Sequence, residues 1–208
     1  MTLFIMNLDI FKKLAKLFNE NGFSLFMIGG TSRDYLLKLE VFDYDFVSDA
    51  TPEDMKKFLP DANYSFEKYG SVKVKLDGVH ADITTFRKEE GYLDYRHPSK
   101  ITYVKTILED YVRRDFTINA IYIDKDMKVI DPSGGLEDLK NKVIRFIGDP
   151  ETRIKEDPLR ILRAERFKEK LNFRIEEKSL DAINKFRYLL DKLNPDKIKE
   201  EQRKLKVK

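Results

Sequence analysis

Asp43 and Asp45 are the residues whose type and spacing best suit chemistry. Because side chains alternate between the faces of a strand, both carboxylates point the same way on an extended segment, while Tyr44 and Phe46 point into the core. Two carboxylates this close raise each other's pKa unless a cation lies between them. Oxygen ligands suit Mg²⁺, and two such ions about 3.5–4 Å apart can activate a hydroxyl and stabilise a leaving pyrophosphate. The spacing predicts a two-ion magnesium site, and a solvated strand end is the alternative.

A glycine pair precedes these aspartates. A short apolar run, 24–28, is typical of a buried strand, and Gly29-Gly30 then breaks it before a helix. This arrangement lets backbone N–H groups and the helix N-terminus face a phosphate. It lacks the Gly-Lys-Ser/Thr ending of a Walker loop and the third glycine of a Rossmann fingerprint. Arg33 is placed to reach a polyphosphate and Asp34 to orient its neighbours, although an ordinary strand-turn-helix would look the same.

A third carboxylate, Asp82, lies in a neighbouring predicted strand. Near the metal ions it would serve as a ligand or a proton acceptor. An exposed aspartate on an edge strand is the alternative. The two histidines, His80 and His97, have no zinc-type partners in the sequence and are assigned no role.

The composition narrows the class of protein. The 208 residues suffice for one ordinary domain with a smaller satellite, and a net charge of +3 is too small to indicate nucleic acid binding by itself. The chain has no cysteine, which excludes disulfides and thiolate sites. No stretch approaches the roughly 18 apolar residues of a membrane span, and no cleavable signal is evident. We therefore expect a cytoplasmic protein without membrane contact.

The elements that must hold these residues are indicated by apolar periodicity. In the first part of the chain we expect a helix over 8–20 ended by Asn21-Gly22, a helix capped by Thr31-Ser32, a strand over 44–47 and a helix over 48–59. Alternating runs over 71–76 and 79–86 flank Asp77-Gly78 and predict a hairpin. A charged, turn-rich loop over 87–100 precedes strand-like runs within 113–123 and at 129–130. Beyond Pro132 the patterns are mostly helical.

Three ordered motifs resemble a known family. Residues 29–34 with 43–45 resemble motif A of the polymerase-β-type nucleotidyltransferases. Residues 113–120 resemble motif B of the class II tRNA nucleotidyltransferases (CCA-adding enzymes) and bacterial poly(A) polymerases. Residues 156–160, continuing to Arg163 and Arg166, resemble the nucleobase-reading motif D of that family. The resemblance covers about residues 26–173, with Ser32 standing where the family usually has an apolar residue.

The resemblance implies an α+β fold: a polymerase-β-like nucleotidyltransferase head, with a mixed sheet flanked by helices, followed by an all-helical neck. We expect the head over residues 1–145 and the nucleobase-reading neck over 146–208. The family continues into body and tail domains that grip the tRNA, and we expect these to be absent from a chain that stops at Lys208.

Motif D implies how the base is chosen. Asp157 and Arg160 lie on the apolar stripe of their helix, where a charge is costly unless it is paired or used. The Asp157 carboxylate can accept from the amino group of cytosine or adenine, while the Arg160 guanidinium donates to the ring nitrogen. Guanine and uracil present a carbonyl and an N–H there, and each good contact is worth roughly 1–3 kcal/mol. A helix cap formed by Asp157 before Pro158 is the alternative or additional role.

The other roles are also implied by resemblance. Arg114 and Asp115 would bind the ribose, whose 2′-hydroxyl distinguishes RNA from DNA, and Asn119 would support the phosphates. The triphosphate would be bound by Arg33, Arg114, Arg163 and Arg166, with Gly29 and Gly30 at the turn. For Arg166 a solvated basic face is an equal alternative. Residues 87–105 resemble the loop linked to switching from C to A addition, and the basic tail over 192–208 is a candidate RNA contact or a solvated helix.

These features together predict an enzyme that adds C and A to the tRNA 3′ end from CTP and ATP, using two Mg²⁺ ions. An A-adding partner of a split system and a bacterial poly(A) polymerase are the related alternatives, and residues 69–73 favour the CCA-adding members. A silent RNA- or nucleotide-binding module of the same fold is the alternative from another class. The paired Asp43 and Asp45 speak against it, because a protein that only binds has no need for a paired metal site.

Overall fold

The computed structural model describes residues 8–92 and 98–206 as two compact units. The first contains the chain up to Lys88 together with Ile101–Tyr111 and Asn119–Ser133, and the second contains Glu89–Lys100, Val112–Ile118 and everything from Gly134 onward. The chain thus passes between the units several times. The predicted head and neck boundary at residue 145 stays a prediction.

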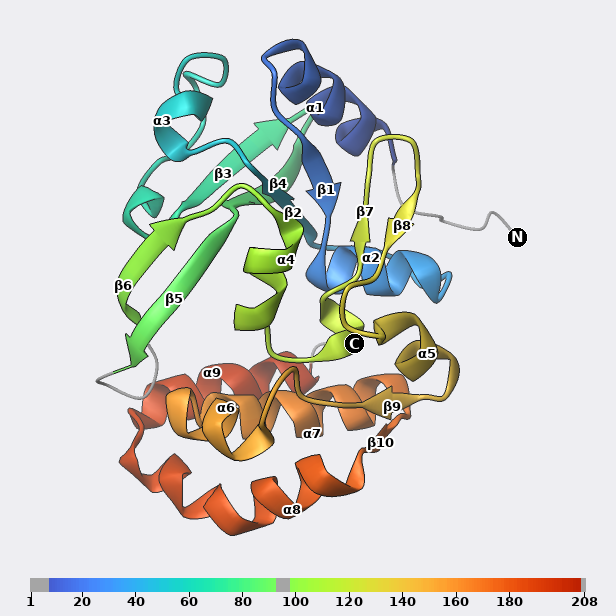
Figure 1. The fold of residues 1–208 in the computed structure, drawn as a ribbon, viewed down its shortest axis with the longest axis vertical. Coiled ribbons are helices and arrows are strands. Elements are labelled where there is room, and N and C mark those ends of the chain that lie inside the picture. The colour runs from blue at the N-terminus through green and yellow to red at the C-terminus, as the bar shows by residue number, and fades with distance from the viewer. Residues whose placement is uncertain (1–7, 93–97, 207–208) are drawn as a thin grey trace. The chain divides into compact units, whose positions relative to one another are not determined.

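A six-stranded mixed sheet organises the first unit (Figure 1). Its strands are β1 (Leu25–Met27), β2 (Tyr44–Ser48), β3 (Ser71–Leu76), β4 (Val79–Thr85), β7 (Tyr122–Ile123) and β8 (Val129–Ile130). The spatial order is β3-β4-β2-β1-β7-β8, with β2 and β4 parallel and the other neighbours antiparallel. The mixed sheet is therefore the one that the sequence led us to expect.

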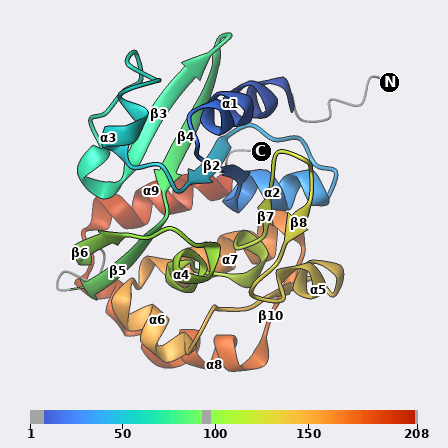
Figure 2. The same cartoon turned by 45° about the horizontal axis from the view of Figure 1, so that its top comes forward.

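Helix α1 (Leu8–Glu20) supplies much of the core beneath this sheet (Figure 2). Its apolar face buries Phe11, Leu14 and Phe18 in the same cluster as Phe46 of β2 and Ile83 of β4. Burying a large apolar side chain contributes roughly 1.5–3 kcal/mol, so this face anchors the helix to the strands. The bounds match the predicted helix, and Gly22 follows it with a φ of 83°.

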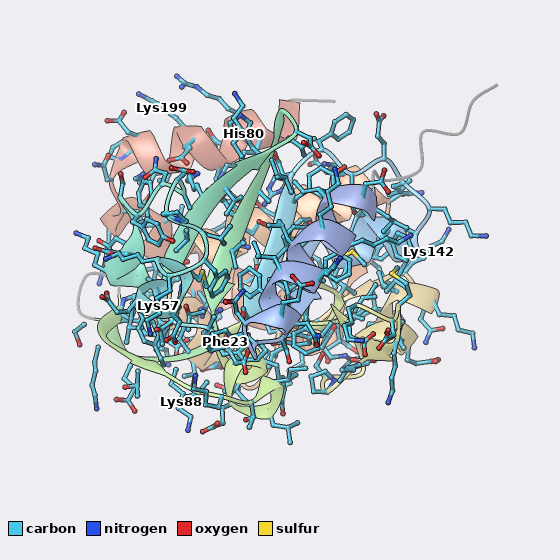
Figure 3. All side chains as sticks on the ribbon, turned by 90° about the horizontal axis from the view of Figure 1, so that it is seen from above. Phe23, Lys57, His80, Lys88, Lys142 and Lys199 are labelled. Carbon is cyan, nitrogen blue, oxygen red and sulfur yellow. The ribbon has the colours of Figure 1, made fainter. Side chains whose placement is uncertain are left out.

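The hairpin of β3 and β4 is also as predicted. Asp77 and Gly78 both have positive φ, 51° and 81°, which a tight two-residue turn requires. Inward residues such as Val72 and Ile83 are fully buried on paired positions. His80 lies exposed on β4 near this turn (Figure 3), and His97 lies outside the described residues.

Two helix predictions in this unit were wrong in their extent. The helix expected over 48–59 is reduced to α3 (Pro52–Met55), which begins at a capping box between Thr51 and Asp54. Pro52 can occupy only the first turn because it has no N–H, so the chain before it stays in β2 and a bend. Helix α2 (Gly29–Leu36) begins at the glycine pair rather than after Thr31, and its N-cap, Ile28, makes no side-chain cap.

The expected loop over 87–100 instead contains two paired strands, β5 (Arg87–Tyr92) and β6 (Pro98–Tyr103). The exposure of β5 roughly alternates along the strand, and charged residues occupy both sides: Lys88 and Glu90 are exposed, whereas Arg87 and Glu89 are half-buried. The many charged residues favoured a loop in the sequence. They are nevertheless compatible with strands, because neighbouring strands are joined by backbone hydrogen bonds. The connection over residues 93–97 lies outside the described part.

The second unit is mainly helical. It contains α5 (Gly135–Lys140), α6 (Pro150–Glu156), α7 (Leu159–Leu171), α8 (Glu177–Phe186) and α9 (Pro195–Lys206), with α4 (Ile107–Asp110) belonging to the first unit. Two-residue strands β9 (Val143–Ile144) and β10 (Arg174–Ile175) pair in parallel. Helix α6 packs against α8, and α7 packs against α9.

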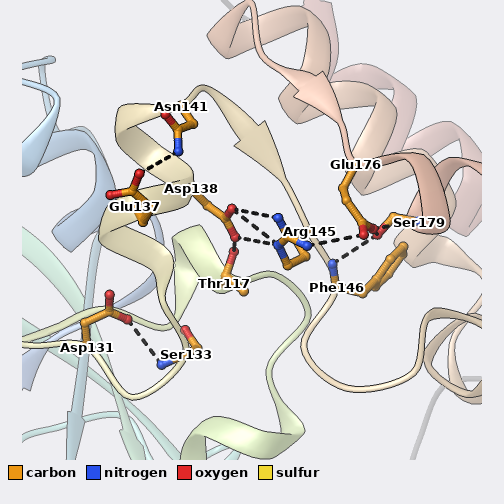
Figure 4. A network of polar contacts seen from close by, with 10 residues as sticks. All are labelled: Thr117, Asp131, Ser133, Glu137, Asp138, Asn141, Arg145, Phe146, Glu176 and Ser179. Carbon is orange, nitrogen blue, oxygen red and sulfur yellow. Dashed lines mark hydrogen bonds and ion pairs between the residues drawn. The ribbon is translucent and has the colours of Figure 1, made fainter.

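A polar network ties several segments of the second unit together (Figure 4). Asp138 of α5 is buried and accepts hydrogen bonds from Thr117 at 2.7 Å and from Arg145, whose Nε lies 3.1 Å away. Arg145 also pairs with Glu176 at 3.2 Å, and Glu176 caps α8 by accepting from the Ser179 N–H. A buried carboxylate is stable only when it is paired and hydrogen-bonded, and this one is.

Within the described part of the chain, no helix is both long and apolar enough to cross a membrane.

Candidate active site

The two aspartates are held against the glycine turn by one hydroxyl. Thr31 Oγ1 accepts a hydrogen bond from the Asp45 N–H at 2.7 Å and donates one to the Asp43 carbonyl at 3.0 Å. The Ile28 N–H donates to the Asp45 carbonyl at 3.1 Å. The sequence indicated Thr31 only as a helix cap, and this prediction was wrong because α2 begins two residues earlier. The one sequence feature that could have indicated this role is the position of Thr31 directly after the glycine pair.

The carboxylate of Asp45 lies directly over this turn. A Cβ placed on Gly29 would lie 3.3 Å from Asp45 Oδ2, and one on Gly30 would lie 3.9 Å from the same oxygen. Gly29 also has a φ of 66°, in the left-handed region that glycine tolerates. Position 29 therefore favours glycine both for its backbone conformation and for the close approach of the carboxylate, whereas a Cβ on Gly30 would make only ordinary van der Waals contact.

Asp43 and Asp45 have the alternation that was predicted. Strand β2 begins at Tyr44, and Asp43 lies at the bend just before it. Tyr44 and Phe46 are 8% and 1% exposed, whereas Asp45 is half-buried and Asp43 is exposed. Both carboxylates are therefore excluded from the core at the same end of the strand, as a shared metal site requires.

Asp82 is the register partner of Asp45 on the parallel neighbour strand β4. The alternative of an edge strand is wrong, because β4 lies between β3 and β2. Its carboxylate lies 3.5 Å from Lys73 Nζ, and both side chains are nearly half exposed. Asp82 therefore lies on the strand next to the aspartate pair, but its carboxylate already forms an ion pair with Lys73.

The donor set suits a hard divalent cation. Among residues 8–92 and 98–206, no three His, Cys, Asp or Glu side chains lie close enough together to hold a metal ion. Mg²⁺ does not need such a cage, because it keeps several waters and is commonly bound by one or two carboxylates plus substrate phosphates. Two aspartates beside a glycine turn that can receive phosphates fit this pattern.

Arg33, expected to reach a polyphosphate, is 3% exposed. Its Nη1 donates to Asn119 Oδ1 at 2.7 Å, and its Nη2 pairs with Asp34 at 2.7 Å. Arg33, Asp34 and Asn119 therefore form one buried polar group within the first unit. Asn119 and Asp34 orient the guanidinium before any ligand binds. They also occupy N–H groups that could otherwise donate to a phosphate.

In the second unit, Arg160 is one of the most enclosed charges. It is 5% exposed, and its Nη1 donates to Glu156 at 2.8 Å and to the Arg153 carbonyl at 2.7 Å. Burial by itself lowers the pKa of this guanidinium, but the Glu156 hydrogen bond and the nearby Asp157 raise it overall. Arg160 therefore stays charged, and Glu156 orients it.

Tyr92 of β5 covers the Arg160 guanidinium, whose Cζ lies 5.9 Å from the ring centroid. The Tyr92 hydroxyl donates to Glu89 at 2.8 Å, and Glu89 also pairs with Arg113 at 3.3 Å. Burial, with the nearby Glu89 carboxylate, raises the pKa of Tyr92 to about 12. Neither Glu89 nor Tyr92 was singled out in the sequence, because the segment resembled a loop.

Asp157 lies between α6 and α7, where its carboxylate accepts from the Leu159 N–H at 3.1 Å. The predicted cap was wrong in its position, because Pro158 occupies the N-cap of α7 and Asp157 is the C-cap of α6, although the Asp157 carboxylate does accept from the first N–H of α7. The apolar stripe is confirmed, with Ile161, Ala164 and Phe167 buried.

Asp115 and Arg163 form a second pair. Asp115 is 7% exposed, lies 2.6 Å from Arg163 Nη2 and accepts from the Phe116 N–H at 2.7 Å. The Arg114 carbonyl accepts from Arg153 at 2.8 Å. The motif B segment is therefore connected to α7 by Asp115 and to α6 by Arg153, all within the second unit.

Arg166 pairs with Glu201 of α9 at 3.0 Å, with side chains 15% and 8% exposed. Burial lowers the pKa of Arg166 and Glu201 opposes that effect. The alternative of a solvated basic face was wrong for Arg166, because its side chain is largely buried against Glu201. Helix α9 is otherwise a surface helix, as one of the two alternatives for the tail expected: it packs against α7, and most of its described residues are exposed. Glu201 was not identified in the sequence, since it lies 35 residues away.

Comparison with known proteins identifies the chain's relatives. Residues 25–145 match the family model of the poly A polymerase head domain. The CCA-adding enzyme of Lactobacillus helveticus is 42% identical over 93% of this chain and 49% of its own length. The chain spans about half the length of the curated relatives it matches.

Solved structures agree with the sequence relatives. The Bacillus stearothermophilus CCA-adding enzyme in complex with CTP matches with a TM-score of 0.87 and 32% identity, over 95% of this chain and 48% of that one. The Thermotoga maritima CCA-adding enzyme complexed with tRNA matches with a TM-score of 0.77 and 30% identity, over 97% and 47%. The polymerase-β-like α+β fold is therefore confirmed. The chain belongs to the poly A polymerase head domain family, and its resemblance to the class II tRNA nucleotidyltransferases is confirmed.

Proposed function

We propose that this chain is a template-independent nucleotidyltransferase that adds C and A to the 3′ end of tRNA, taking them from CTP and ATP and releasing pyrophosphate. The observation that carries the proposal is the Asp45 carboxylate lying over the Gly29-Gly30 turn, beside Asp43. This places acidic metal ligands next to backbone that can receive phosphates. Relatives named as CCA-adding enzymes, including structures with CTP and with ATP, support the same activity.

Metal-dependent chemistry is typical of this family, and we propose two Mg²⁺ ions held by Asp43 and Asp45. Asp82 is a candidate third ligand only if its side chain moves toward the pair, because the described side chains do not form a group of three ligands in this structure. Bound there, the ions would activate the RNA 3′-hydroxyl and stabilise the leaving pyrophosphate. Thr31 contributes by fixing the backbone of both aspartates. Lys73 holds Asp82 at 3.5 Å and sets how readily this third carboxylate is available.

The residues of the first unit would also bind the triphosphate. The Gly29-Gly30 turn presents backbone N–H groups at the start of α2, where a helix favours negative charge. Arg33, held by Asn119 and Asp34, places a fixed positive charge close to that turn. Its guanidinium Nη2 would lie 3.6 Å from a Cβ on Gly30.

The second unit would choose the base and bind the ribose. Arg160 donates to the ring nitrogen and Asp157 accepts from the amino group, so cytosine and adenine fit while uracil and guanine do not. Glu156 keeps the Arg160 guanidinium in place for this contact. Asp115 and Arg114 would contact the ribose, and Arg163 and Arg166 the phosphates. A cytoplasmic location is part of the same proposal.

The deciding experiment offers a tRNA or a tRNA minihelix that lacks its CCA end, with Mg²⁺ and each nucleotide separately. The acceptor RNA is used at high concentration, so that addition can be detected even if the chain binds RNA weakly. We expect CTP and then ATP to extend the acceptor to a defined CCA end, with GTP and UTP inactive and with the activity lost in EDTA. A long A ladder would instead identify a poly(A) polymerase, and addition of A alone after CC would identify an A-adding enzyme.

The Asp43→Asn variant separates an enzyme from a binding module. Removing one carboxylate of the pair should abolish incorporation while nucleotide binding, measured without metal, changes little. Glu40→Gln, an exposed acid on the same segment, is the matched control. Equal activity of Asp43→Asn and the control would overturn the proposed role of the metal site.

A further inference from the structure

Two exposed apolar residues, Leu39 and Phe42, precede the aspartates in the chain. They are 46% and 69% exposed. Val41 and Tyr44, on either side of Phe42 and Asp43, are buried in the core at 7% and 8% exposure. The bend at Asp43 therefore leaves two successive side chains, Phe42 and Asp43, outside the core, where strict alternation would have separated them.

Single exposed apolar residues are common and by themselves need no explanation. The position of Phe42 is what makes it informative, since its backbone is joined to that of a proposed metal ligand. The segment between α2 and β2 is held firmly at both ends. The Leu39 N–H donates to the Asp34 carbonyl at 2.9 Å, and the Asp43 carbonyl accepts from Thr31 at 3.0 Å. The ring is thus presented to solvent from a segment that is hydrogen-bonded at both ends.

We propose that the Phe42 ring is the platform on which the 3′-terminal base of the acceptor RNA stacks. The inference rests on the proposed function. The attacking 3′-hydroxyl must reach the carboxylates of Asp43 and Asp45, and the terminal base is attached to the same ribose. An aromatic ring adjoining Asp43 is therefore within reach of that base.

Stacking suits an enzyme whose acceptor end changes after every addition. A hydrogen-bonding site would recognise one terminal base, whereas every base has a π-face that an aromatic ring accepts. The charges nearby also favour a base over a phosphate. Lys38 and Glu40, both exposed, flank Leu39 with opposite charges, so the segment offers no net positive charge to the RNA backbone.

The test compares Phe42→Leu, which keeps an apolar side chain without the ring, with Phe42→Tyr, which keeps the ring. Leu108→Ala is the matched control, because Leu108 of α4 is also 69% exposed. The measured quantity is addition of one nucleotide from CTP as the acceptor RNA is varied. Phe42→Leu should raise the KM for the acceptor by about 5- to 100-fold, with the KM for CTP unchanged. Phe42→Tyr and Leu108→Ala should stay within about twofold of the unchanged chain.

A second measurement is independent of catalysis. An acceptor RNA ending in 2-aminopurine is mixed with the protein in EDTA, and its fluorescence should be quenched by the unchanged chain and by Phe42→Tyr but not by Phe42→Leu. Quenching without any nucleotide addition would overturn the proposed function and leave the stacking platform standing. Equal acceptor KM and equal quenching in the Leu and Tyr variants would overturn the platform. So would a change of oligomeric state in Phe42→Leu, which would show that a second copy covers the ring.

Discussion

Replacing Glu201 by Gln removes the carboxylate that pairs with Arg166 at 3.0 Å between α9 and α7. Both side chains are largely buried, so the guanidinium would keep its desolvation cost without its partner. Loss of one member of a buried pair costs about 3–5 kcal/mol. Since Arg166 is 15% exposed and also packs over Phe167, we expect the lower end, about 3 kcal/mol of unfolding free energy.

Glu200→Gln is the matched control on the same helix. Its side chain is 49% exposed and pairs with Lys204 at 3.7 Å and with Lys197 at 3.1 Å. Exposed pairs contribute little, so its effect should stay below about 0.5 kcal/mol. Urea unfolding followed by circular dichroism measures both variants, and equal midpoints and slopes for the two would refute a buried ion pair between the helices.

The pH dependence gives a second signature. Burial by itself raises the pKa of Glu201, but the positive charges of Arg166, Lys204 and Arg163 lower it below its ordinary value of 4.5. A folded-state pKa below the unfolded one contributes stability that is complete above about pH 4.5 and is lost as the pH falls through the folded value. The difference in unfolding free energy between the unchanged chain and Glu201→Gln should therefore shrink below that pH. A difference that grows on acidification would contradict the assigned direction.

Two further predictions follow from the close contacts. Gly29→Ala should place a methyl group 3.3 Å from Asp45 Oδ2 at a φ of 66°, which displaces the carboxylate and adds about 1–3 kcal/mol of strain. Nucleotide addition should fall at least tenfold, and a fully active variant would show that the glycine is not needed. Tyr92→Phe loses only the hydrogen bond to Glu89, whereas Tyr92→Leu also uncovers Arg160. Misincorporation of UTP and GTP, measured by product length, should rise in the Leu variant and not in the Phe variant. An equal rise in both would assign the effect to Glu89 instead.

Local signals in the sequence were sufficient for the elements nearest the site. Helix α1, the β3–β4 hairpin at Asp77-Gly78 and the apolar stripe of α7 were predicted correctly. Each depends on residues only a few positions apart, whose periodicity or turn conformation is a property of the segment itself. The Asp43-x-Asp45 alternation was predicted for the same reason.

The errors have a common physical cause. Thr31 was interpreted as a cap, although its hydroxyl is used to hold the backbone of β2. Residues 87–100 were interpreted as a loop, although β5 and β6 pair with each other. In both cases the local composition is compatible with either structure, the predicted one or the observed one. A hydrogen-bond partner from another segment of the chain decides which of them forms.

The residue types and spacings in this chain are enough to identify the family, and they carry the proposals for the acidic pair and the base-reading pair, because each of these features lies within a short motif. Only the tertiary structure shows which side chains pair with the buried arginines. Arg33 meets Asn119 across 86 residues, and Arg166 meets Glu201 across 35. An ion pair or hydrogen bond needs proximity in space, which packing of distant segments creates and which spacing along the chain does not encode.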